Sequence, residues 1–101
     1  MHYKIKRLKS FDSSAFEADS YLYALSPNVA DKYFDDYSYK IGLIEDNPYM
    51  YQEFDDDPYF RSVPLVYGYR LFYHIDEHRK FVILHRIIHG AMDIEQQLRN
   101  S

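Results

Sequence analysis

Cysteine is absent from this 101-residue chain, so neither a disulfide framework nor a thiolate nucleophile is available to it. The sequence has only three glycines, and none lies in a glycine-rich phosphate-binding loop. Its unbroken apolar runs, such as 81–84, are far shorter than the roughly twenty residues that span a bilayer. Residues 1–11 are charged and lack an apolar stretch, so we expect no signal peptide and a soluble cytoplasmic protein.

The apolar content is nevertheless high enough for a folded domain. Hydrophobic residues make up 47 % of the chain, and 12 Tyr and 7 Phe account for much of that share. A disordered segment would have few aromatic residues and a lower hydrophobic content. A chain of this length is expected to form a single core, so we predict one domain over residues 1–101.

Charge is distributed unevenly along the chain, although its net value is only −4. Residues 1–11 contain four Lys or Arg and no acid, whereas residues 12–60 contain twelve acids and two lysines. Residues 61–101 contain six Lys or Arg, four of the five histidines and four acids. This balance disfavours strong non-specific binding to nucleic acid but leaves room for a local anion site.

The first half of the chain predicts a strand followed by two helices. Residues 3–9 alternate imperfectly, as in an edge strand. Ser14 and Glu17 have the spacing of a capping box and predict the start of the first helix. Ser26 and Pro27 suit the first positions of a second helix, which should end before the Asn-Pro pair at 47–48. The short link between them predicts an antiparallel helical hairpin.

The second half predicts a loop, three strands and a short helix. Residues 48–60 lack a clear period and read as a loop, with room for a short strand. Residues 61–67, 69–76 and 80–88 are rich in β-branched and aromatic residues and read as strands. Asp93 is placed to cap a short C-terminal helix. The predicted fold class is therefore α+β, with an N-terminal strand, a helical hairpin, and a three-stranded antiparallel meander that completes one sheet.

Three consecutive acids, Asp55, Asp56 and Asp57, occupy the predicted loop. Consecutive carboxylates cannot all face one ion, and the ligand spacing of a calcium loop is absent. We interpret the segment as a solvated acidic loop. Its tyrosines either pack over the edge of the sheet or line a groove for a partner.

Cationic residues interrupt the two strands of the last predicted hairpin, whose turn we place near His78. An antiparallel pairing across this turn sets Arg70 opposite Arg86 on one face. The other face is more apolar and should receive the helices. His85 is expected on that core side, near its rim.

Two arginines that face each other across strands repel, so a physical reason for the pair is needed. One hypothesis is an anion site in which Arg70 and Arg86, joined by Arg61, hold a phosphate or a partner's carboxylate. The alternative is that each arginine extends over an aromatic ring or pairs with an acid of the middle segment. Both readings remain open from the residues alone.

Two histidines, His85 and His89, are the candidate proton-transfer groups. They are four residues apart, which in a strand corresponds to roughly 13 Å, so we expect no metal site and no cofactor. His89 lies beside Gly90 at the end of a strand. There it acts either as a general acid or base or only as a cap for the backbone.

The order of these features resembles the RelE/ParE superfamily of bacterial toxins from type II toxin–antitoxin systems. The most specific segments are "YGYRLFYHIDE", "FVILHRIIHG" and the acidic residue that follows. The resemblance covers nearly the whole chain and implies that residues 1–101 form one RelE/ParE-like toxin domain. It also implies that the protein inhibits growth until a cognate antitoxin binds it. The assembly that it implies is either a toxin–antitoxin hetero-oligomer or a homodimer of the toxin.

The resemblance leaves the target open between DNA gyrase and ribosome-bound mRNA. In the mRNA-cleaving branch, Arg70 matches a phosphate-binding arginine, but the second arginine is replaced by Ala91 or Met92. A late tyrosine is missing near Glu95, and "YQEFDDD" stands where lysines are expected. These departures favour a gyrase-poisoning toxin. The alternatives are an endoribonuclease in which Arg61, Arg70 and Arg86 hold phosphate while His85 or His89 moves the proton, and a non-catalytic module that only binds a partner.

Overall fold

The computed structural model describes residues 3–90 and 93–99. Their order is β1 (Lys4–Arg7), α1 (Lys9–Leu25), α2 (Pro27–Asp46), β2 (Glu53–Phe54), β3 (Asp57–Pro64), a 3₁₀ turn η1 (Val66–Gly68), β4 (Tyr69–Asp76), β5 (Phe81–His89) and α3 (Ile94–Arg99). This order confirms the predicted α+β class. No helix in the described part is long and apolar enough to cross a membrane.

The second helix has the predicted bounds, but the first begins earlier than expected. Ser26 is the N-cap residue of α2, Pro27 opens the helix, and Asn47 follows its last turn. Helix α1 begins at Lys9, so the capping-box prediction at Ser14 was wrong. The chain passes directly from β1 into α1, and the Leu8 carbonyl accepts the first helical N–H groups.

One mixed sheet carries all five strands in the order β1-β5-β4-β3-β2. Strands β3, β4 and β5 form the predicted antiparallel meander. β1 runs parallel to β5 at one edge, and the two-residue β2 pairs with β3 at the other. The four-residue turn 77–80 joins β4 to β5, close to the predicted position.

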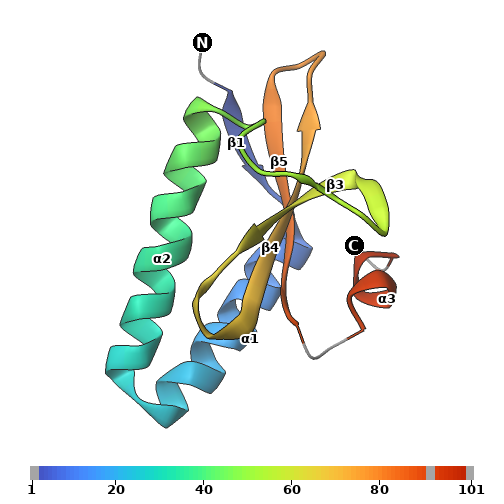
Figure 1. Cartoon of the computed structure of the whole chain (residues 1–101). Coiled ribbons are helices and arrows are strands. Elements are labelled where there is room, and N and C mark those ends of the chain that lie inside the picture. Colours follow the sequence, from blue (N-terminus) through green and yellow to red (C-terminus); the bar gives the residue numbers. More distant parts are fainter. Residues whose placement is uncertain (1–2, 91–92, 100–101) are drawn as a thin grey trace.

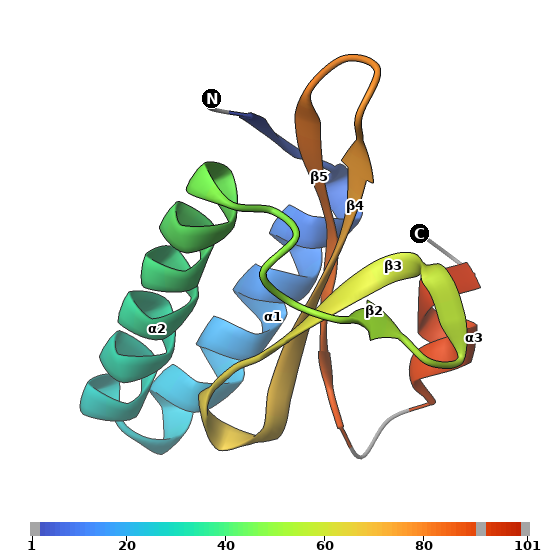
Figure 2. The same ribbon diagram turned by 45° about the horizontal axis from the view of Figure 1, so that its top comes forward.

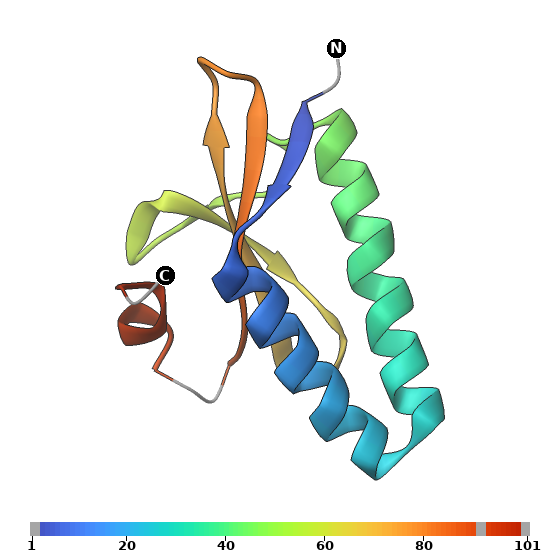
Figure 3. The ribbon, with the colours of Figure 1, turned by 180° about the vertical axis from the view of Figure 1, so that it is seen from behind.

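The sheet has two unlike faces. Helices α1 and α2 cover one, here called the helix face, whereas α3 lies on the other, here called the open face (Figures 1 and 3). The main core fills the helix face with buried side chains of both helices and of β3, β4 and β5. The open face has a much smaller apolar cluster, made by Phe60, Phe72, Ile88 and Leu98.

Helix α1 also closes the edge of β5 beyond the short strand β1. The ladder between β1 and β5 ends at Leu84, whose carbonyl accepts the Leu8 N–H at 3.1 Å. Ser10 Oγ then donates to the His85 carbonyl at 2.6 Å, and Ser14 Oγ accepts the Ile87 N–H at 2.9 Å. Two serines of a helix therefore continue the hydrogen bonding of an edge strand, which explains why Ser14 is buried.

Candidate functional site

The arginines of the β4–β5 hairpin share a face, but they do not lie opposite each other. Arg70 pairs with Ile88, and Phe72 pairs with Arg86, so the two arginines are diagonal neighbours on the open face. The predicted face is therefore correct, and the predicted direct pairing is wrong. A β-bulge shifts the register, because Phe72 pairs with Arg86 while the next residue, Tyr73, pairs with Leu84.

The bulge also places His85 on the open face and not on the helix side where we expected it. His85 is the extra residue of β5, and its ring meets Phe60 of the open-face cluster edge-on at 4.8 Å. Its side chain is 9 % exposed, and neither ring nitrogen has a hydrogen-bond partner in the described part of the chain. Burial, with a smaller contribution from His74, lowers the pKa of His85 to about 4, so the imidazole is neutral at pH 7.

Arg70 is held by a neighbouring strand and borders a large cavity. Its Nη1 donates to the Oγ of Ser62 on β3 at 2.6 Å, and Ser62 itself is buried. Within the described residues, Arg70 forms no ion pair. The guanidinium is thus oriented but retains its charge for a ligand.

Arg86 borders a different and smaller cavity, of about 160 Å³, between α1, β5 and α3. Its Nη1 lies 3.5 Å from Oε1 of Gln97 on α3, and Glu17 lines the same cavity. Arg70 lines only the larger cavity. The two guanidiniums therefore do not converge on one cavity, although both belong to the open face.

Arg61 does not join them, contrary to the prediction. It pairs with Tyr73, whose side chain belongs to the helix-face core, so Arg61 projects to the side opposite Arg70. Its Nη1 donates to the Tyr51 carbonyl at 2.7 Å, and its guanidinium lies 4.9 Å from the centre of the Tyr49 ring. These contacts fix the loop after α2 to the sheet, which is a structural role.

His89 also lies on the other side of the sheet from Arg70. It pairs with Tyr69, a helix-face residue, and its ring meets the Tyr69 ring edge-on at 5.0 Å. A Cβ added at Gly68, whose φ is +80°, would lie 3.2 Å from the His89 Nε2. His89 therefore packs against the turn before β4 and does not approach the arginines of the open face.

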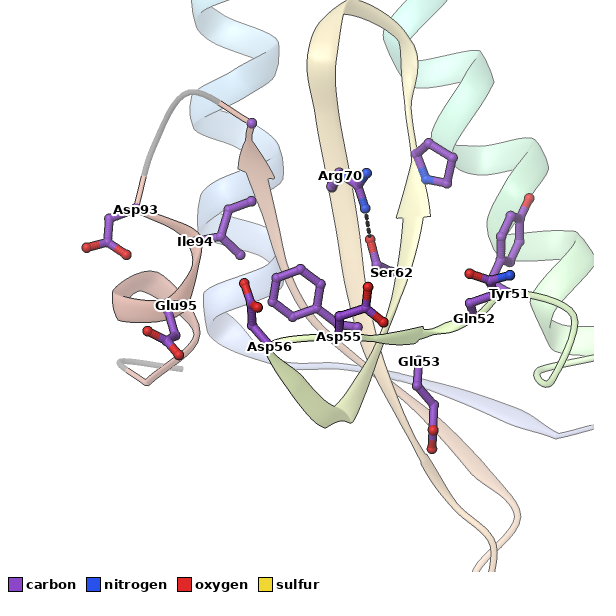
Figure 4. A pocket seen from close by; sticks show the side chains of 13 residues that line it. Tyr51, Gln52, Glu53, Asp55, Asp56, Ser62, Arg70, Asp93, Ile94 and Glu95 are labelled. Atoms are coloured by element: carbon purple, nitrogen blue, oxygen red, sulfur yellow. Dashed lines mark hydrogen bonds between the residues drawn. The ribbon is translucent and has the colours of Figure 1, made fainter.

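The cavity beside Arg70, here called the Arg70 pocket, is a large concave feature of the open face. It has a volume of about 1050 Å³ and is lined by residues of the β2–β3 hairpin and of α3. Figure 2 shows this hairpin beside α3. Arg70, Ser62 and Pro64 line its inner side, and Phe54 and Ile94 contribute apolar surface. Figure 4 shows the Arg70 guanidinium beside Ser62, with the carboxylates of Asp55 and Asp56 between Ser62 and Ile94.

Carboxylates dominate the lining of this pocket. Five acidic residues and a single arginine border it, and the acids are Glu53, Asp55, Asp56, Asp93 and Glu95. The acidic loop was predicted, but its closeness to Arg70 and to the C-terminal helix was missed. The signal for it is the clustering of acids in two segments, 53–57 and 93–95, which the fold brings to one cavity. No group of metal-ligating residues forms within residues 3–90 and 93–99.

The remaining predicted elements of the site are partly described. Asp93 caps α3 as expected, since its Oδ1 accepts the Gln96 N–H at 3.2 Å. Glu95, which stands where the late tyrosine was expected, lies 3.4 Å from Arg99 in the same helix. Ala91 and Met92, which replace the second arginine of the mRNA-cleaving branch, lie outside the described residues.

The geometry of the open face suits binding better than proton transfer. The Arg70 pocket contains an oriented cation and several carboxylates. The candidate bases are placed unfavourably, because His85 is buried under aromatic rings and His89 lies on the opposite face. A general base must reach the proton that it removes, and neither histidine does so at Arg70.

Comparison with known proteins agrees with this architecture. The chain is similar in structure to the toxin–antitoxin complex RelBE2 from Mycobacterium tuberculosis, with a TM-score of 0.61 and 16 % sequence identity over 88 % of this chain and 99 % of that chain. No curated protein sequence matches it. A sequence profile of the family described as ParE toxin of type II toxin–antitoxin system, parDE, matches residues 5–94. The chain therefore belongs to the ParE toxin family.

Proposed function

We propose that this chain is the toxin of a type II toxin–antitoxin module and that it inhibits growth by binding its target, with DNA gyrase as that target. Family membership supports the toxin role, because the matching profile covers residues 5–94. The likeness to RelBE2, a toxin–antitoxin complex, supports a protein antitoxin as partner. Gyrase as the target rests on the resemblance to the gyrase-poisoning branch, and the placement of the histidines disfavours the RNA-cleaving alternative.

The observation that carries the binding mechanism is the separation of the arginines from any usable base. Arg70 and Arg86 lie on the open face, whereas His89 lies on the helix face. His85 shares the open face but is buried, and its ring nitrogens have no hydrogen-bond partner among the residues that the structure describes. Cleavage of RNA by its own 2′-hydroxyl needs a base and charge stabilisation at one place, and this arrangement supplies only the second.

Purified protein in two assays tests this proposal. We expect inhibition of DNA supercoiling by gyrase and no cleavage of ribosome-bound mRNA. Cleavage that disappears in His89→Ala would instead identify an endoribonuclease. No effect in either assay, together with normal growth during overexpression, would indicate a module that only binds a partner.

The role of the open-face arginines is tested by a double variant. We expect Arg70→Ala/Arg86→Ala to weaken growth inhibition or antitoxin binding by at least about fivefold, the effect of losing roughly 1 kcal/mol of contact energy. Arg79→Ala is the matched control, because Arg79 lies in the exposed β4–β5 turn and only approaches Asp76 at 3.9 Å. Unchanged toxicity and unchanged affinity in the double variant would remove both arginines from the site.

A further inference from the structure

We infer that the Arg70 pocket binds an extended, Lys- or Arg-bearing segment of a protein partner, and that it does not bind a nucleic-acid phosphate. The inference rests on the proposed function only for the identity of that partner, which is then the antitoxin. The pocket itself is defined by its lining, its volume and its charge.

The charge of the Arg70 pocket favours a cationic ligand. Five carboxylates and one guanidinium line the cavity, so its surface is strongly acidic. A nucleic acid that placed a phosphate on Arg70 would bring neighbouring phosphates close to these carboxylates, and like charges repel. A cationic peptide meets the opposite situation, since its charges complement the lining.

Two of the carboxylates are available for a ligand. Within the described part of the chain, Asp55 and Asp56 form no ion pair or side-chain hydrogen bond. Glu53 and Glu95 each already lie within 4.0 Å of an arginine. Both free carboxylates line the pocket, and Figure 4 shows them between Ser62 and Ile94.

The shape and polarity of the pocket also favour a Lys or Arg side chain. Phe54 and Ile94 are half-buried and form apolar surface beside these carboxylates. A Lys or Arg side chain matches this arrangement, because its methylene stem packs on apolar surface while its charged end reaches an acid. A cavity of about 1050 Å³ has room for several side chains, so an extended segment fits better than a single residue.

Arg70 is placed to bind the backbone of such a segment. Its guanidinium is oriented by the buried Ser62 and borders the cavity from the inner side. An extended peptide has backbone carbonyls that accept hydrogen bonds from such a donor. Arg70 therefore fixes the backbone of the bound segment, and the acids select its side chains.

Binding of short fluorescent probes to the full-length chain tests the inference. The probes are a capped (Ala-Lys)₅ peptide, a capped (Ala-Glu)₅ peptide and a ten-nucleotide oligouridylate, each measured by fluorescence anisotropy at low salt. We expect the lysine peptide to bind most tightly. We expect Asp55→Asn/Asp56→Asn to weaken its binding about fivefold, and added salt to reduce the difference.

Asp31→Asn/Asp35→Asn is the matched control, because it removes the same charge from exposed positions of α2, on the far side of the sheet. We expect less than a twofold change for this variant. Equal weakening by both double variants would show non-specific attraction and overturn the inference. Tighter binding of oligouridylate or of the glutamate peptide, lost in Arg70→Ala, would also overturn it and would identify an anion site. Growth inhibition and supercoiling test the toxin role separately, so failure here leaves that proposal standing.

Discussion

The two faces of the sheet differ in whether their buried polar side chains have hydrogen-bond partners. On the helix face, the hydroxyls of the buried Tyr33 and Tyr73 donate to the carbonyls of Ala15 and Pro48, and burial raises the pKa of both phenols. On the open face, His85 is also buried, but its ring nitrogens have no hydrogen-bond partner in the described residues. The helix face therefore satisfies the polar groups that it buries here, whereas the open face leaves the buried His85 ring unsatisfied in the described residues.

The apolar clusters of the two faces differ in the same direction. Among the described residues, the helix face holds sixteen buried residues in one cluster, contributed by both long helices, three strands and Leu65 after β3. The open face holds four, and one of them, Leu98, belongs to the six-residue helix α3. Because a short helix gains little stability by itself, α3 depends on these few contacts for its position. The Arg70 pocket therefore has one wall on the sheet and one on a weakly held helix.

Truncation of a core side chain on the helix face should cost far more stability than truncation on the open face. Leu84→Ala removes a fully buried side chain of the helix-face core and should lower the free energy of unfolding by about 3–4 kcal/mol. Leu98→Ala on the open face should lower it by about 1–2 kcal/mol, because α3 can detach without opening the main core. Chemical denaturation of both variants gives these values. Equal losses would mean that the two clusters unfold as one unit.

The second effect depends on pH and comes from His85. Its pKa is about 4 in the folded chain and about 6.5 in the unfolded chain, so below pH 6.5 the unfolded state binds a proton that the folded state does not. Above pH 6.5 the titration of His85 does not lower the free energy of unfolding. As the pH is lowered to 4, the free energy of unfolding should fall by up to about 3 kcal/mol. Denaturation at several pH values measures this loss.

The pH effect has two controls. His85→Phe should flatten the decline between pH 6.5 and 4, because the titrating group is gone. His78→Ala should keep the full decline, since His78 is exposed in the β4–β5 turn. A decline of the same size in His85→Phe would assign the pH dependence to groups other than His85.

The third effect concerns the edge of β5, where the helix face and the open face meet. Ser14→Ala leaves the buried Ile87 N–H without its acceptor and should cost about 1–2 kcal/mol of stability. The neighbouring Ser13→Ala, at an exposed position of the same helix, should change stability by less than about 0.5 kcal/mol. Similar small effects in both variants would show that water replaces the serine.

Local signals in the sequence were enough to predict the element order and several boundaries. The Ser-Pro and Asn-Pro pairs bound α2 because proline restricts the backbone at helix ends, and the alternation of β4 and β5 assigned Arg70 and Arg86 to a common face. The start of α1 could not be found in this way. It is set by the hydrogen bond between Leu8 and Leu84, which are far apart in the sequence.

The candidate site was only partly predictable for the same reason. Alternation alone assigns His85 to the helix face, and only the bulge, packed against Phe60, turns it to the open face. The Arg70 pocket combines residues from three separate parts of the chain: 51–56, 62–70, and Gly90 together with 93–95. Their convergence requires α3 to dock on the sheet, and no spacing within any one segment encodes that contact.

The smallest change in stability is expected for a substitution of Arg70 on the open face. Arg70→Ala should lower the free energy of unfolding by less than about 1 kcal/mol, because the side chain is exposed and contributes one hydrogen bond, to Ser62. Thermal denaturation and circular dichroism would check that the fold persists. A loss as large as that of Leu84→Ala would make Arg70 a structural residue. A small loss together with weaker partner binding would mean that the open face keeps this cation for recognition, because its contribution to folding is too slight to explain its place there.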